Sequence, residues 1–131
     1  MSPLRPTFAA ILCLMGMMGD SHAQQPAATL SEGWRFSERS GEALYANLCQ
    51  ACHMSKGEGA VGAGRYPVLA KNPNLVAPYV VGVVLNGQRG MPPFGRMLRD
   101  DQIAAVVNYL RTHMGNAYSD PVSALEVAQA R

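Results

Sequence analysis

The chain has 131 residues, 48% of them apolar and 15% charged, and its formal net charge is +2. This length and apolar content predict one small globular domain and argue against a disordered chain. The small net charge and the lack of a long basic run argue against a polyanion-binding surface. The sequence has no G-x-G-x-x-G motif, no P-loop and no apolar run of about 20 residues, which argues against a nucleotide-binding fold and a transmembrane helix.

Residues 1–23 have the pattern of an export signal peptide. Arg5 precedes an apolar run at 8–18, and Ala23 closes a small-residue site that a signal peptidase accepts. The apolar run is too short to span a membrane; a buried N-terminal helix is the alternative interpretation. We expect the signal to be removed on export to the bacterial periplasm. Cys13 leaves with it, so the remaining cysteines predict no disulfide framework.

Residues 24–39 are polar and irregular, and we interpret them as an N-terminal extension. Trp34 and Phe36 are its only large apolar residues, so the extension is expected either to lie over the domain or to meet a partner. The patterned domain then covers residues 40–118. Residues 119–131 form a C-terminal tail.

Three helices are predicted in the domain, which makes the fold class all-α. The first runs over 40–49, and the hydroxyl of Ser40 suits its N-cap. The second runs over 78–87, opening on a proline and closing on a glycine. The third runs over 100–114 and carries an apolar stripe with helical spacing. The stripe consists of Ile103, Val106, Val107, Leu110 and Met114.

Loops are expected between these helices. The four glycines at 57–64 predict a loop without regular structure, and residues 87–98, with two prolines, also predict a loop. A further short helix is expected at 123–129 in the tail. Because three short helices bury little surface on their own, a domain of this size needs a staple or a cofactor.

Residues 49–53 supply such a cofactor site. Cys49-Gln50-Ala51-Cys52-His53 is a Cys-x-x-Cys-His motif, the attachment site of a c-type haem. One helical turn brings both thiols along one edge of a porphyrin, where Cys49 and Cys52 form thioethers with its two vinyl groups. The imidazole of His53 then lies over the ring and reaches the iron as proximal ligand. We therefore predict one covalently bound haem c with its iron.

Two other chemistries use paired cysteines. A zinc site would need two further ligands at suitable spacing, and outside the motif the mature chain offers only His113 and scattered acids. A thioredoxin-like redox pair would need a βαβ pattern, which this sequence lacks. Haem attachment is therefore the stronger interpretation.

The distal iron ligand is argued by elimination among the eight methionines. Four leave with the signal, Met54 follows the proximal histidine on the wrong face, and Met114 belongs to the core stripe. Met91 lies in a loop whose prolines fix the backbone and whose glycine permits close approach to the ring. We predict Met91 as the distal ligand, with Met97 as the second choice. The alternative is a packing methionine beside an open or His-ligated iron.

Several segments match a known family. They are Gly41, Tyr45, the haem motif, Tyr66-Pro67-Val68-Leu69-Ala70, Val84-Leu85-Asn86-Gly87, the Met91 loop and the helix from Ile103 to Gly115. On these residues the chain resembles the class I cytochrome c family over almost all of 40–115. More narrowly, it is similar to the small cytochrome subunits of periplasmic dehydrogenases and hydroxylases, including the p-cresol methylhydroxylase and eugenol hydroxylase type.

The resemblance implies a small class I cytochrome c fold, with three main helices around the haem. It also implies that the helix holding Gly41 and Tyr45 crosses the helix holding Tyr109 and Leu110. Many relatives have a proline after the haem motif, and its carbonyl accepts a hydrogen bond from the proximal histidine. The corresponding stretch here, 61–64, has no proline. Another backbone carbonyl of that stretch can serve instead, and the sequence leaves its identity open.

The ligands predict an electron carrier and not an enzyme, because two filled axial positions keep substrates from the iron. A thioether opposite a histidine also raises the reduction potential. The resemblance implies redox partner proteins, with a periplasmic dehydrogenase or hydroxylase as electron donor, and no nucleic acid. The alternatives are a freestanding carrier to a terminal oxidase and a peroxidase-like haem enzyme in which Met91 dissociates.

In class I folds only the haem edge near the thioethers is exposed. The resemblance therefore implies an apolar docking patch, surrounded by a basic rim, at this edge. The patch would consist of Ala51, Met54, Val61, Pro92, Pro93 and Phe94, and the rim of Lys56, Arg65, Arg89 and Arg96. The alternative for Arg89 is a contact with a haem propionate.

Overall fold

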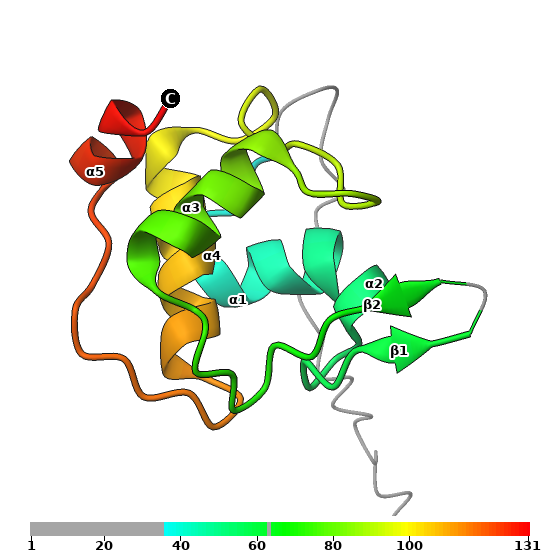
Figure 1. Cartoon of the computed structure of the whole chain (residues 1–131). Coiled ribbons are helices and arrows are strands. Elements are labelled where there is room, and N and C mark those ends of the chain that lie inside the picture. Colours follow the sequence, from blue (N-terminus) through cyan, green and yellow to red (C-terminus); the bar gives the residue numbers. More distant parts are fainter. Residues whose placement is uncertain (1–35, 63) are drawn as a thin grey trace, which may run out of the picture.

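The computed structural model describes residues 36–62 and 64–131 of the chain. The expected signal peptide at 1–23 and most of the extension at 24–39 lie outside these residues. The elements are α1 (Gly41–Leu44), the π-helix η1 (Tyr45–Cys49), α2 (Gln50–His53), β1 (Ala60–Val61), β2 (Arg65–Tyr66), α3 (Ala77–Asn86), α4 (Asp100–Thr112) and α5 (Ala124–Gln129). Helices dominate, as the all-α prediction requires, and the described residues add one two-stranded sheet (Figure 1). None of their helices has the length and hydropathy to cross a membrane.

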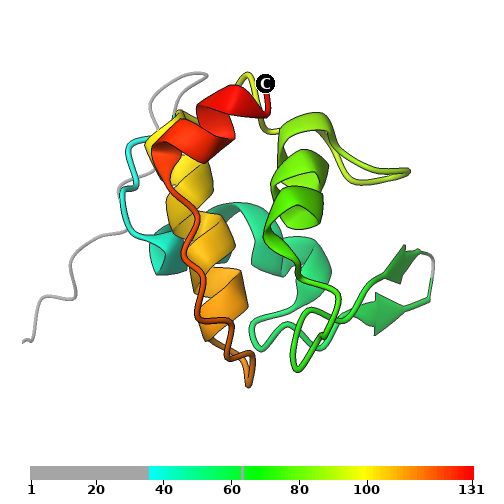
Figure 2. The same ribbon diagram turned by 60° about the vertical axis from the view of Figure 1, so that its left-hand side comes forward.

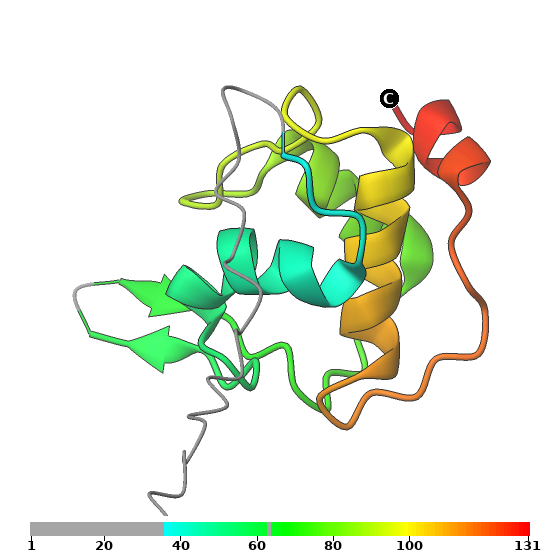
Figure 3. The same cartoon turned by 180° about the vertical axis from the view of Figure 1, so that it is seen from behind.

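The elements α1, η1 and α2 follow one another without a break over residues 41–53 (Figure 3). The Ser40 hydroxyl accepts a hydrogen bond from the backbone N–H of Ala43 at 3.2 Å, which confirms the predicted N-cap. The π-helical turn ends on Cys49, the first cysteine of the haem motif, and such turns are frequent at functional sites. The helical segment ends at Met54, whose φ of 65° is left-handed.

This first helical segment packs across α4 at Gly41. A Cβ atom at position 41 would overlap the carbonyl oxygen of Ala105 and lie 2.6 Å from the Cβ of Tyr109. Only glycine therefore permits this approach of the two backbones. One turn further on, the ring centroids of Tyr45 and Tyr109 are 5.7 Å apart. The crossing that the family resemblance implies is confirmed.

The bounds of α3 and α4 lie close to the predicted ones. The apolar stripe of α4 is confirmed as core, since Ile103, Val106, Val107 and Leu110 are all buried. The helix ends at Thr112, two residues before the predicted end at Met114. Its continuation is broken because Met114 and Gly115 adopt left-handed φ values of 57° and 79°.

The prediction that residues 57–64 have no regular structure is wrong. Strands β1 and β2 pair antiparallel, with Ala60 opposite Tyr66 and Val61 opposite Arg65. Gly59, with a φ of 67°, donates its N–H to the carbonyl of His53 at 3.1 Å and turns the chain from α2 into this hairpin. The glycines therefore serve the entry and the tip of a hairpin that extends from the haem motif (Figure 1).

The tail after Tyr118 packs against α4. Figure 2 shows the chain running back along α4 before it enters α5, the helix in the segment where the sequence suggests one. Arg111 of α4 is only 1% exposed; its Nε donates to the carbonyl of Leu75 at 2.9 Å and its Nη2 lies 2.7 Å from Asp120 Oδ2. Val127 of α5 is fully buried. The tail therefore contributes to the core.

Candidate haem-attachment site

The predicted haem ligands lie at the end of the first helical segment. Cys49 closes the π-helix η1, and Cys52 and His53 belong to α2. Both thiols are free and half-buried, and His53 is 9% exposed. Burial, with a smaller contribution from the neighbouring Cys52, raises the pKa of the Cys49 thiol to about 12. In this structure Cys49 therefore stays a neutral thiol at physiological pH.

The His53 ring is held in one orientation by a backbone carbonyl. Its Nδ1 lies 2.9 Å from the carbonyl oxygen of Pro67 and donates a hydrogen bond to it. With the proton on Nδ1, the other nitrogen, Nε2, carries a free lone pair, which is the state an iron ligand requires. The same hydrogen bond increases the basicity of the ring.

The prediction that a carbonyl of residues 61–64 supports His53 is wrong. The stretch belongs to the hairpin formed by β1 and β2. The chain leaves the haem motif into this hairpin, and Pro67, which follows β2, lies beside His53. The supporting residue is nevertheless a proline, three positions beyond the predicted stretch. The segment Tyr66–Ala70, which matches the family, was the available signal, but sequence spacing alone did not reveal the hairpin.

Further hydrogen bonds fix the loop between His53 and Pro67. The carbonyl of Gly57 accepts from the N–H groups of Leu69 at 2.7 Å and Ala70 at 3.0 Å. A Cβ atom at position 57, where φ is 68°, would lie 2.5 Å from the sulfur of Met114. Met114 thus packs under this loop, in agreement with its predicted packing role.

Tyr45 links the core to the end of the haem motif. Its hydroxyl donates to the carbonyl of Met54 at 2.6 Å, at the residue where the helix stops. Burial, and then the nearby Cys49 thiol, raises the pKa of Tyr45 to about 12, so the hydroxyl keeps its proton and remains a donor. Tyr45 is one of the residues that carry the family resemblance, but the sequence did not predict this contact.

The predicted distal ligand lies in a loop that is bonded to the end of α3. Met91 pairs with Gln88 through two backbone hydrogen bonds of 3.0 and 3.1 Å, which close a tight turn. Gly87, with a φ of 72°, opens this turn, and a Cβ atom there would lie against the carbonyl of Met91. Met91 and Met97 are both half-buried and contact the core. Burial therefore does not separate the two candidates.

The loop at 87–98 and α2 lie on the same side of the molecule. Figures 1 and 2 show that loop, α2 and the hairpin extending away from α4 and α5 in both views. Three apolar side chains, Val68, Val76 and Tyr79, are each more than half exposed. The expected docking patch needs one correction, because Phe94 is only 9% exposed and packs in the core. Val61 is 88% exposed.

These residues fit a c-type haem. Two thiols stand one helical turn apart, and the imidazole that follows them has its second nitrogen free. Across residues 36–62 and 64–131, no three His, Cys, Asp or Glu side chains gather closely enough to hold a metal ion directly. The described residues thus offer no zinc cluster that would compete with this interpretation.

Comparison with known proteins agrees with the geometry. A family profile described as "Cytochrome C oxidase, cbb3-type, subunit III" matches residues 37–110. The chain is 39% identical to the fructose dehydrogenase cytochrome subunit of Gluconobacter japonicus over 70% of its own length and 22% of that protein. It is 34% identical to the gluconate 2-dehydrogenase cytochrome c subunit of Pantoea cypripedii over 71% of its length and 24% of that protein.

A second kind of relative is covered almost completely. The chain is 30% identical to cytochrome c6 of Euglena gracilis over 61% of its own length and 97% of that protein. It spans about a quarter or less of the dehydrogenase subunits. The predicted similarity to dehydrogenase cytochrome subunits is confirmed, whereas the hydroxylase type is not shown by these matches.

Proposed function

Because this chain belongs to the cytochrome c family, we propose that it carries single electrons through a haem c whose iron is held by His53 and Met91. The observation that carries the proposal is the hydrogen bond from His53 Nδ1 to Pro67, which leaves Nε2 free directly after the two cysteines. When bound, haem c supplies an iron that alternates between Fe(III) and Fe(II). The roles of the chain's own residues follow.

Cys49 and Cys52 anchor the cofactor, and His53 serves as the proximal ligand. The carbonyl of Pro67 fixes the ring of His53. With haem bound, this contact would hold the ligand in place in both oxidation states and so keep the reorganisation energy small. The hydrogen bond from Tyr45 to Met54 holds the chain where it leaves the motif. These contacts favour electron transfer over catalysis, because they preserve an unchanging ligand set.

Met91 serves as the distal ligand in this proposal. Its turn is closed by two backbone hydrogen bonds, and the following residues are bonded to the end of α3. Such a loop presents a thioether at a fixed place, and a thioether opposite histidine raises the reduction potential. With haem bound, Met91 would occupy the place at the iron that a substrate such as peroxide would need.

We propose a dehydrogenase as electron donor and the bacterial periplasm as the site of action. The names of the relatives support a dehydrogenase partner, and the pattern of residues 1–23 supports export. A docking surface for the partner is suggested by the exposed Val61 and by a basic rim around it. The rim consists of Lys56, Arg65, Arg89 and Arg96. An apolar centre permits close approach, while rim charges set orientation and encounter rate.

The distal ligand is tested with two methionine variants of the haem-loaded protein. Met91→Ala should abolish the weak long-wavelength absorption of the thioether–Fe(III) bond and the strongly shifted methyl resonance of the reduced form. It should also lower the potential and let imidazole bind. Met97→Leu is the matched control and should change neither signal. If both signals survive Met91→Ala and vanish in Met97→Leu, the ligand is Met97.

A further inference from the structure

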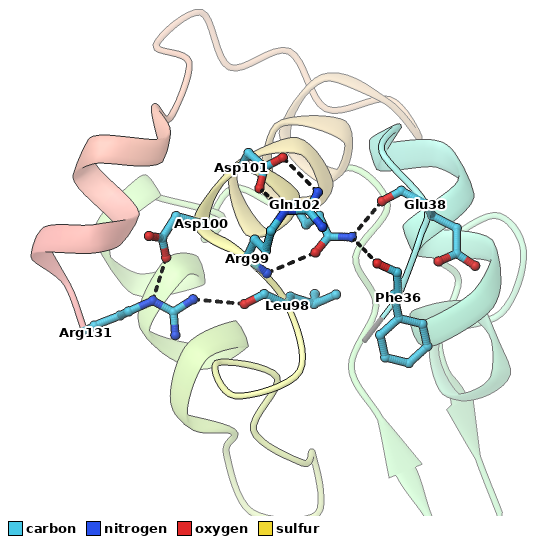
Figure 4. A network of polar contacts seen from close by, with 8 residues as sticks. All are labelled: Phe36, Glu38, Leu98, Arg99, Asp100, Asp101, Gln102 and Arg131. Carbon is cyan, nitrogen blue, oxygen red and sulfur yellow. Dashed lines mark hydrogen bonds and ion pairs between the residues drawn. The ribbon is translucent and has the colours of Figure 1, made fainter. Parts of the chain in front are cut away.

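Both terminal segments of the described chain attach to one short region, residues 95–102, where the Met91 loop passes into α4. Figure 4 shows Arg131 approaching this region from one side and Phe36 with Glu38 from the other. The side chain of Gln102 donates to the carbonyls of both Phe36 and Glu38 at 2.8 Å. The end of the loop is thus held from two directions.

Arg131 makes the larger set of contacts. Its Nε lies 2.5 Å from Asp100 Oδ1, its Nη2 donates to the carbonyl of Leu98 at 3.0 Å, and its Nη1 donates to the carbonyl of Gly95. One planar guanidinium therefore joins two loop carbonyls to the first residue of α4. A guanidinium suits this task because its donors form a rigid fork.

The tail holds Arg131 in position. Val122 and the side chain of Asn108 exchange two hydrogen bonds of 2.8 Å, and Val127 is fully buried against the core. The buried Arg111 pairs with Asp120 at the start of the tail. With these anchors before it, Arg131 has less freedom to lose than an ordinary surface arginine.

The loop is also held from the inside. The N–H groups of Phe94 and Gly95 donate to the carbonyls of Val84 and Leu85, each at 3.0 Å. Gly95 is therefore fixed on both sides, its N–H by α3 and its carbonyl by Arg131. A Cβ atom at position 95 would lie 2.8 Å from the Leu85 carbonyl, so the backbones are already in close contact.

From these contacts we infer that Arg131 is a positioning residue for the distal ligand: it clamps residues 95–100 and so keeps Met91 on the iron. The inference rests on the proposed function, in which Met91 is that ligand. In this inference the loop moves away from α3 when Met91 leaves the iron, and Gly95 and Leu98 then lose their hydrogen bonds to the guanidinium. The clamp binds only the closed loop, so its removal shifts the equilibrium toward the open state.

The test measures imidazole binding to the ferric, haem-loaded protein, since imidazole must displace the distal ligand. Arg131→Gln should bind imidazole about five- to tenfold more tightly, the amount expected when one or two hydrogen bonds to a charged group are lost. Arg131→Lys should restore only part of the difference, because a lysine cannot bridge two carbonyls and a carboxylate. Lys71→Gln removes an exposed cation outside the clamped segment; this variant is the control and should leave the affinity unchanged.

A double variant separates a ligand-positioning role from a general loosening of the fold. In the Met91→Ala background no thioether has to be displaced, so adding Arg131→Gln should leave imidazole affinity unchanged. An equal gain in both backgrounds would overturn the inference, as would no gain in the wild-type background. If Met91→Ala alone keeps the thioether–Fe(III) absorption, the proposed function fails first and the inference fails with it.

Discussion

Two regions of this molecule treat their charges in opposite ways. Residues 54–98 carry five cationic side chains and one acidic one, Glu58. The cations are Lys56, Arg65, Lys71, Arg89 and Arg96. Residues 99–131 carry three cations and four acids. All three ion pairs among the described residues, Arg99–Asp101, Arg111–Asp120 and Arg131–Asp100, lie in this second region.

The backbone shows the same contrast. Among the described residues of the region 54–98, six have left-handed φ values: Met54, Gly57, Gly59, Lys71, Gly87 and Arg89. All but Lys71 lie at the exit from the haem motif, at the entry to the hairpin or in the Met91 turn. The region 99–131 has two such residues, Met114 and Gly115, both just beyond the end of α4. Residues 99–131 therefore form a scaffold that neutralises its own charges. Residues 54–98, called the loop region here although they also hold β1, β2 and α3, leave their cations to solvent or to a partner.

The largest expected effect comes from removing the covalent attachment. Three short helices bury little apolar surface without a cofactor, so the Cys49→Ala/Cys52→Ala double variant should yield little helical product. Circular dichroism with thermal unfolding checks this. Cys13→Ser is the control, since that cysteine lies in the expected signal and should not affect haem incorporation. A cooperatively folded double variant would show that the scaffold region is stable by itself.

The next effect concerns the buried arginine of the scaffold. Arg111→Met leaves the carbonyls of Leu75 and Asp120 without their donor and should lower the free energy of unfolding by about 2 kcal/mol. Denaturant titration of the haem-loaded protein measures the loss, and the reduction potential should stay unchanged. Arg99→Met removes an exposed, solvent-screened pair and should cost much less stability than Arg111→Met. Equal losses in the two variants would contradict the central role of Arg111.

The Arg111–Asp120 contact also has a pH dependence with a definite sign. The hydrogen bond from Arg111 lowers the pKa of Asp120 below the ordinary value of an aspartate. A carboxyl group whose folded-state pKa is depressed stabilises the protein above its unfolded-state pKa and loses that contribution as the pH falls through the folded-state pKa. The difference in stability between the wild type and Asp120→Asn should therefore shrink on acidification. A constant difference from neutral to acid pH would contradict this link.

A smaller effect is expected at Tyr45, which joins the two regions. Its ring contacts Tyr109 of the scaffold, and its hydroxyl donates to Met54 in the loop region. Tyr45→Phe keeps the ring but loses the hydrogen bond, so the free energy of unfolding should fall by about 1 kcal/mol. Tyr66→Phe, at a more exposed position of the hairpin, is the control and should have little effect. Equal stability of wild type and Tyr45→Phe would mean that the hydroxyl contact adds nothing.

The two regions also differ in how far the sequence predicts them. Residue spacing was sufficient for the Ser40 cap and the apolar stripe of α4, because both depend on neighbours within a few helical turns. It failed for the hairpin and for the carbonyl that supports His53, since glycines permit several loop paths and only pairing across the loop selects one. The contacts of Arg131 with Gly95 and Leu98 join residues more than 30 positions apart. No local pattern in the sequence specifies them.

The smallest effect on stability, and the sharpest test of the comparison, is charge reversal in the loop region. Lys56→Glu and Arg96→Glu change exposed side chains that form no ion pair among the described residues, so the free energy of unfolding should move by less than about 0.5 kcal/mol. Electron delivery from the proposed dehydrogenase donor should nevertheless become slower and its dependence on salt weaker, because rim charges steer encounter. Arg39→Glu, an exposed cation beside the start of α1, is the control and should leave the rate unchanged. Arg89→Glu separates the two roles considered for that residue: a partner of a haem propionate would shift the potential, whereas a docking residue would alter only the rate. Unchanged kinetics in the Lys56, Arg96 and Arg89 reversals would show that these cations do not contribute to docking and that the interface lies on another face.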